Sequence, residues 1–121
     1  MLILYVAIGG AAGSVARYLL TGALATPVPP TFPLGTFAVN MIGCFVFGLV
    51  AGGAERQFTL TPEGRTFLLA GLLGGFTTFS SYAYETFVLA GQGHFLYAAA
   101  NAAGQVVLGL LALWAGYALL R

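Results

Sequence analysis

The sequence predicts an all-α integral membrane protein with four transmembrane helices. Of its 121 residues, 60% are hydrophobic and only 6% are charged, whereas about a quarter of the residues in soluble domains are charged. Four apolar stretches follow one another along the chain, each close to the roughly 20 residues that a helix needs to cross a bilayer. Because these stretches use up most of the length, we expect residues 1–121 to form a single transmembrane domain.

The first span is expected over residues 2–24 and the second over residues 34–54. Residues 26–33 between them hold four of the five prolines, which remove amide donors and favour a loop. Both spans contain glycines four residues apart, a spacing that lets two helix backbones approach closely. These pairs are Gly9 with Gly13 and Gly48 with Gly52.

The third span is expected over residues 65–90, with an interruption near residues 74–78. Thr61-Pro62-Glu63 predicts a helix start upstream, with proline in the first turn. Two adjacent glycines, two threonines and two serines at the centre disfavour a continuous helix. Non-helical backbone at membrane depth is tolerated only where it is buried in protein or lines a wet cavity. The fourth span is expected over residues 95–120.

Composition and spacing exclude several classes of function. A formal net charge of +1 cannot make the basic surface that binds nucleic acid. The chain has no paired carboxylates, no metal-ligand spacing of cysteine and histidine, and no phosphate-binding loop, so we expect no enzyme. We interpret the lone Cys44 as a packing residue and His94 as a solvated turn residue.

Four spans place both termini on one side of the membrane, together with the loop between the second and third spans. That side carries Arg56, Arg65 and Arg121, while Arg17 lies within the first span toward the other side. Because cytoplasmic loops are enriched in arginine and lysine, this bias favours cytoplasmic termini.

The interrupted third span is the strongest candidate for a functional site. The amides that begin its second half suit an anion, and the carbonyls that end its first half suit a cation. Phe76, Phe79 and Tyr82 recur every three residues and are expected on one helix face. Their ring edges carry partial positive charge, so they form either a packing stripe or a wall for an anion. The hydroxyls of the same stretch favour the second interpretation: Thr77, Thr78, Ser80 and Ser81.

Other polar residues lie within the remaining spans. Asn40 in the second span, and Asn101 and Gln105 on one face of the fourth, are either helix contacts or donors along an ion route. Charged residues inside spans are functional candidates by default. Arg17 either faces an aqueous vestibule, where it attracts anions, or extends to the membrane surface. Glu85 either caps or pairs within the fold, and its role stays open.

Three segments, in this order, resemble the CrcB/Fluc family of fluoride channels, and the resemblance covers nearly the whole chain. They are residues 9–18 (GGAAGSVARY), 35–43 (GTFAVNMIG) and 74–80 (GGFTTFS). The resemblance implies a passive, fluoride-selective channel that exports fluoride from the cytoplasm through the plasma (inner) membrane. It also implies a homodimer of oppositely inserted subunits, in contact with membrane lipid, with two fluoride pathways along the interface.

The resemblance further implies roles for particular residues. Phe79 and Tyr82 supply the ring edges of the pathway, and Asn40 reaches into it from the second span. A structural sodium ion is held by backbone carbonyls of Gly74 and Thr77. Tyr82 departs from the family, which usually has a second phenylalanine there, and its hydroxyl either donates to fluoride or narrows the path.

Two other classes of membrane protein compete with the channel interpretation. A small multidrug-type antiporter needs a membrane carboxylate in its first span, where this chain has Arg17 and no acid. A non-transporting membrane assembly subunit would explain the glycine-rich faces but not the polar interruption.

Overall fold

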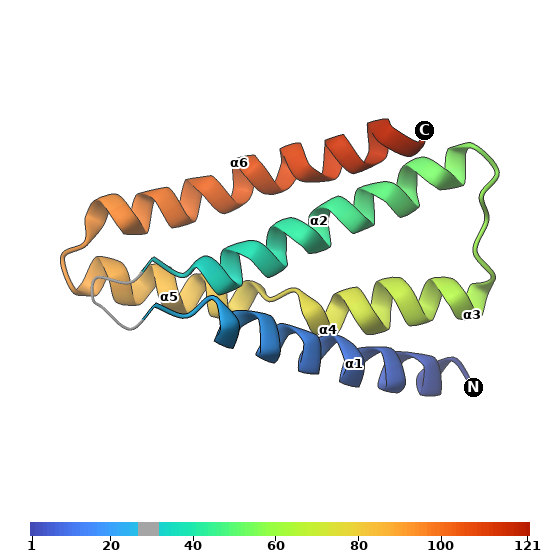
Figure 1. Cartoon of the computed structure of the whole chain (residues 1–121), viewed down its shortest axis with the longest axis horizontal. Coiled ribbons are helices and arrows are strands. Elements are labelled where there is room, and N and C mark those ends of the chain that lie inside the picture. The colour runs from blue at the N-terminus through green and yellow to red at the C-terminus, as the bar shows by residue number, and fades with distance from the viewer. Residues whose placement is uncertain (27–31) are drawn as a thin grey trace.

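The computed structural model describes residues 1–26 and 32–121, and the regular secondary structure of this part of the chain is all helical (Figure 1). Three continuous helices are long and apolar enough to cross a membrane. They are α1 (Leu2–Ala23), α2 (Leu34–Glu55) and α6 (Phe95–Leu120). Of the loop expected over residues 26–33, residues 27–31 lie outside the described part.

The third span consists of four consecutive helical pieces. They are α3 (Pro62–Arg65), the π-helix η1 (Thr66–Leu73), α4 (Gly74–Phe76) and α5 (Phe79–Gly91). Thr61 caps α3 by accepting a hydrogen bond from the Gly64 N–H at 3.1 Å, and Pro62 occupies the first helical position. The predicted helix start is therefore confirmed, whereas the π-helix was not anticipated.

The interruption falls at Thr77 and Thr78, at the end of the window that the sequence predicted. Both have extended backbone, with φ −82° and ψ 158° at Thr77 and φ −151° and ψ 120° at Thr78. Gly74 and Gly75 remain helical. The Thr78 hydroxyl oxygen accepts the Ser81 N–H at 3.2 Å and caps α5. A capping residue adopts extended backbone, so the cap, and not the glycine pair, sets the position of the break.

The break lets the third span change neighbours as it crosses the molecule (Figure 1). Its first half, η1 and α4, packs against α1, and its second half, α5, packs against α6. α2 and α6 form the most extensive helix pair. Both termini lie at the same end of the molecule as the connection between α2 and α3, as an even number of spans requires.

Helix contacts depend on glycines more than on an apolar core. A methyl group at Gly48 would overlap the Leu113 carbonyl of α6, and one at Gly13 would overlap the Leu72 carbonyl of η1. The predicted close approach at both glycine pairs is therefore confirmed. Among the described residues, the buried apolar side chains are few: Val39, Leu73, Leu89 and Ala98. This is the pattern of membrane helices, which associate by close backbone packing because lipid is as apolar as their side chains.

We expect Gly48→Ala to lower the free energy of unfolding by about 1–3 kcal/mol, the usual cost of overpacking. The new methyl meets a backbone carbonyl, which cannot rotate away as a flexible side chain would. Denaturant titration in detergent micelles measures the loss. The matched control is Gly22→Ala, where no described residue lies within 4 Å of the added methyl. Equal stability of the two variants would contradict the close contact of α2 with α6.

Candidate functional site

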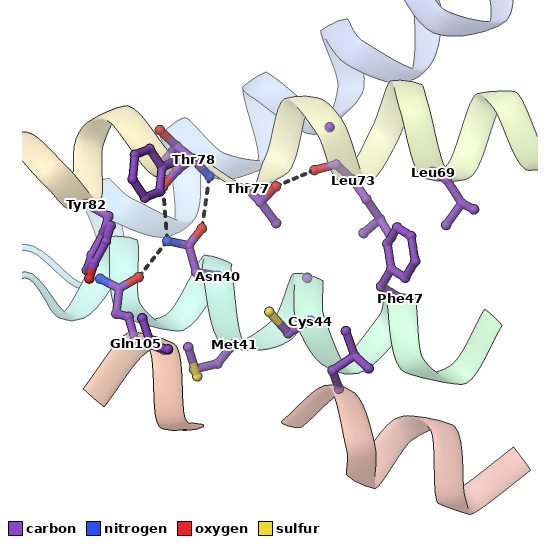
Figure 2. Close-up of a pocket in the computed structure, with 15 residues that line it drawn as sticks. Asn40, Met41, Cys44, Phe47, Leu69, Leu73, Thr77, Thr78, Tyr82 and Gln105 are labelled. Carbon is purple, nitrogen blue, oxygen red and sulfur yellow. Dashed lines mark hydrogen bonds between the residues drawn. The ribbon is translucent and has the colours of Figure 1, made fainter. Parts of the chain in front are cut away.

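An open cleft of about 520 Å³ lies beside the break, between the third span, α2 and α6 (Figure 2). One part of its wall is polar, formed by Asn40, Thr78 and Gln105, and the remainder is largely apolar. Phe79 and Tyr82 line it from α5, and Gly74 and Thr77 line it at the end of the first half-helix. The cleft therefore brings together most of the residues that the sequence analysis selected around the break.

The Asn40 side chain pairs with both backbone hydrogen-bonding groups of Thr78, where the backbone is extended. Its Oδ1 accepts the Thr78 N–H at 2.9 Å, and its Nδ2 donates to the Thr78 carbonyl at 3.0 Å (Figure 2). The same Nδ2 also donates to Gln105 Oε1 at 2.6 Å. Both amide hydrogens of Asn40 are thus engaged within the chain, and neither is free for an anion in this structure.

A line of hydrogen-bonded side chains continues from Asn40 along α6 and α5. Gln105 Nε2 donates to Asn101 Oδ1 at 2.9 Å, and Asn101 Nδ2 donates to Thr86 Oγ1 at 2.9 Å. The Thr86 hydroxyl in turn donates to the Tyr82 carbonyl at 2.8 Å. Asn101 is 0% exposed and Gln105 is 7% exposed. Buried amides need such partners, so these residues join α2, α5 and α6 by a continuous polar line.

The structure separates the three aromatic residues that were expected on one helix face. The rings of Phe79 and Tyr82 lie 5.5 Å apart between centroids and are inclined by 55°. Phe76 belongs to α4 on the other side of the break and does not line the cleft. The expected three-ring helix face is therefore wrong, because extended backbone at Thr77 and Thr78 interrupts the spacing.

The hydroxyl of Tyr82 is directed to α6, where it donates to the Ala102 carbonyl at 2.7 Å. In this structure its proton is therefore not a free donor for an anion. The ring of Phe79 is 77% exposed. It therefore leaves much of its surface open to whatever borders the cleft.

Hydroxyl groups cluster at the first turn of α5. Thr78 Oγ1 donates to Ser81 Oγ at 3.1 Å and lies 3.3 Å from Ser80 Oγ. Ser80 is exposed and Ser81 is half-buried. Because the amino end of a helix favours negative charge, this turn combines hydroxyl donors with a favourable backbone dipole.

The carbonyls of Gly74 and Thr77 lose the donors that a continuous helix would give them. The Thr78 N–H pairs with Asn40, not with Gly74, and the Ser81 N–H pairs with the Thr78 side chain, not with Thr77. Unwound carbonyls of this kind coordinate sodium in membrane proteins. The donor chemistry of the two carbonyls therefore fits the sodium ion that the family resemblance implied.

Two charged residues from the sequence analysis lie outside the cleft. Arg17 is half-buried on α1. Glu85 Oε1 accepts the Thr36 hydroxyl at 2.7 Å. Sequence reasoning missed Thr36 and Thr86, although Thr36 is four residues before Asn40 and so shares its helix face.

Comparison with known proteins identifies the family. Residues 4–117 match the family described as CrcB-like protein, Camphor Resistance (CrcB). The chain belongs to the CrcB family. Its membership accounts for the order of the three motifs and for the four apolar spans, and the chain is accordingly a multi-pass membrane protein.

CrcB relatives match the chain over nearly its full length. A protein from Maridesulfovibrio salexigens is 48% identical over 118 residues, which cover 98% of this chain and 94% of the relative. One from Nitratidesulfovibrio vulgaris is 46% identical, with 94% and 92% covered, and one from Methylobacillus flagellatus is 44% identical, with 98% and 94% covered. All three are named fluoride-specific ion channel FluC, which is a channel and not an enzyme.

We expect Asn40→Leu to lower the free energy of unfolding by about 2–4 kcal/mol. The substitution keeps the size of the side chain but leaves the Thr78 N–H, the Thr78 carbonyl and Gln105 Oε1 without their partner. Each unsatisfied group costs about 1–3 kcal/mol, more than the average of about 0.6 kcal/mol for a polar contact between membrane helices. Denaturant titration in micelles measures the difference.

Asn40→Asp is the matched variant at about pH 4, because burial keeps the carboxyl group protonated there; it retains the acceptor for the Thr78 N–H and loses one of the two donated bonds. We expect its stability to lie between those of the wild type and Asn40→Leu. Wild-type stability of Asn40→Leu would show that the side chain does not hold the break.

Proposed function

We propose that this chain is one subunit of a fluoride-selective passive channel that exports fluoride from the cytoplasm. The observation that carries the proposal is the break at Thr77 and Thr78, which places hydroxyl donors, a helix amino end and two aromatic rings beside one cleft. Relatives at 44–48% identity are named as fluoride-specific channels, and that identity extends over the segments that form this cleft.

The functional unit is an antiparallel homodimer. The extended backbone at Thr77 and Thr78 borders an open cleft, and lipid cannot satisfy unwound N–H and C=O groups. Phe79 also exposes 77% of its surface there. A second copy, inserted in the opposite direction, would cover both features and create two equivalent fluoride routes at the interface. Carbonyls of Gly74 and Thr77 from both copies would then hold the structural sodium between them.

The route must replace the water shell of fluoride. The edges of Phe79 and Tyr82 supply partial positive charge, and Ser80 and Ser81 supply hydroxyl donors at the start of α5. Asn40, Gln105 and Asn101 hold the walls in place and form the polar line along which the ion moves. Arg17 supplies positive charge in the vestibule, and a narrow, rigid path rejects larger halides.

The structure adds no support for the antiporter alternative, because α1 carries no acidic residue. A non-transporting assembly subunit could use the polar line to join its helices, but it would have no use for extended backbone that borders an open cleft.

Purified protein in liposomes loaded with fluoride should release it without an energy source and should retain chloride. Ion-selective electrodes for the two halides follow both in one experiment. We expect fluoride release to exceed chloride release by at least about a hundredfold, because only the small ion fits a rigid path. Equal release of both ions would contradict selectivity, and no release above that of protein-free liposomes would contradict channel activity.

Phe79→Ile should lower fluoride release at least about tenfold while the protein still folds, because the ring is mostly exposed in the subunit and its edge cannot be replaced by an aliphatic side chain. The matched control is Phe87→Ile, which alters a ring of 74% exposure on the same helix that does not line the cleft. The same electrode assay, with size-exclusion chromatography to check folding, compares the two. Equal fluoride release by both variants would show that Phe79 is not part of the pathway.

A further inference from the structure

A second cavity, of about 410 Å³, lies between the end of α1, the start of α2 and α5. Among the described residues that line it, Thr21, Thr36 and Gln92 are polar, Glu85 is the only charged residue, and none is arginine, lysine or histidine. The cavity is separate from the cleft at the break and lies toward the other end of α5.

Glu85 is incompletely paired in this cavity. Its Oε1 accepts the Thr36 hydroxyl at 2.7 Å, but its Oε2 is buried and has no hydrogen-bond partner among the described residues. A carboxylate without a counter-ion inside a membrane span is costly. Protonation of Oε2 removes that cost and turns the atom into a donor.

Two neighbours of Glu85 relate it to the polar line described above. Its hydrogen-bond partner Thr36 is four residues before Asn40 on α2, and Thr86, the next residue on α5, receives the last amide of the line from Asn101. A fluoride route that follows the line from Asn40 to Thr86 would therefore end one residue from Glu85 on α5.

We propose that Glu85 binds a proton, and that only its neutral form lets fluoride pass through the cavity. The inference rests on the proposed function. In the acid form, Oε2–H donates to fluoride; when the proton leaves to water, the carboxylate repels the ion. Tyr84 also lines the cavity from α5. Among the described residues, the other titratable or charged groups toward this end of the packed helices are Arg17 and Tyr18 on α1 and His94 and Tyr97 at the start of α6, and none of them lines the cavity.

The test measures fluoride release from proteoliposomes at equal internal and external pH, with protein-free liposomes subtracted at each pH. Wild-type release should rise at least about tenfold from pH ~8 to pH ~5, because a full charge a few ångströms from the route repels an anion strongly where the dielectric constant is low. Glu85→Gln accepts the Thr36 hydroxyl and donates from its amide, so it mimics the acid. Its release should stay at the high level across the whole range.

Two further variants separate this role from general effects of pH. Thr36→Val removes the donor that stabilises the charged form, so the midpoint of the wild-type profile should move to higher pH by about one unit. Histidine ordinarily changes charge between about pH 5 and 8, so His94→Gln is the control, and its profile should match that of the wild type.

The outcomes distinguish failure of the role proposed for Glu85 from failure of the proposed channel function. A wild-type profile that is flat, a pH dependence that persists in Glu85→Gln, or an unmoved midpoint in Thr36→Val would overturn the role of Glu85 while leaving the channel intact. Absence of fluoride release from every variant at every pH would overturn the proposed function and this inference with it. The Thr36→Val measurement compares the midpoint of the pH profile and not the amount of fluoride released. The test therefore stands even if Glu85→Gln does not fold.

Discussion

The need to satisfy backbone hydrogen-bonding groups at membrane depth governs this molecule. An extended segment in a transmembrane helix exposes N–H and C=O groups that lipid cannot bind, and the Asn40 side chain pairs with both groups of Thr78. Because Thr78 is held in this way, its hydroxyl is free to cap α5, and the carbonyls of Gly74 and Thr77 lack the amide donors that a continuous helix would give them. By holding Thr78, the Asn40 amide produces both ends of the break: the helix amino end that favours an anion and the carbonyls that favour a cation.

The break also has a packing role, because it divides the third span between two sets of neighbours. Its first half packs on α1 and its second half on α6. Glycines fix these contacts at backbone distance, as Gly13 does against Leu72 and Gly48 does between α2 and α6. Contacts between backbones leave little freedom to slide, so the cleft keeps its shape without a large apolar core. Rigidity of this kind is what discrimination between halides by size requires.

Hydrophobic length and the positions of proline predicted the helices well, because both act locally. Helix propensity predicted the break over residues 74–78, and the capping bond of Thr78 and its pairing with Asn40 place it at the end of that window. Propensity is a weak preference that tertiary contacts override. The partners of Asn40 and Glu85 could not be predicted, since they depend on how three helices are rotated about their axes. Thr36 could have been predicted from the sequence, because its four-residue spacing from Asn40 is visible there.

The hydrogen bonds around Asn40 also constrain how fluoride could move if the chain conducts it as proposed. Both Asn40 donors already have acceptors, in the Thr78 carbonyl and Gln105 Oε1. Fluoride can gain an amide donor only by taking the place of one of these oxygens. A hydrogen bond to a charged acceptor is about twice as strong as one between neutral groups, so this exchange favours a small, strongly accepting anion. A larger halide accepts more weakly and would leave the displaced oxygen uncompensated, so under the proposed function the network that holds the break would also discriminate among ions.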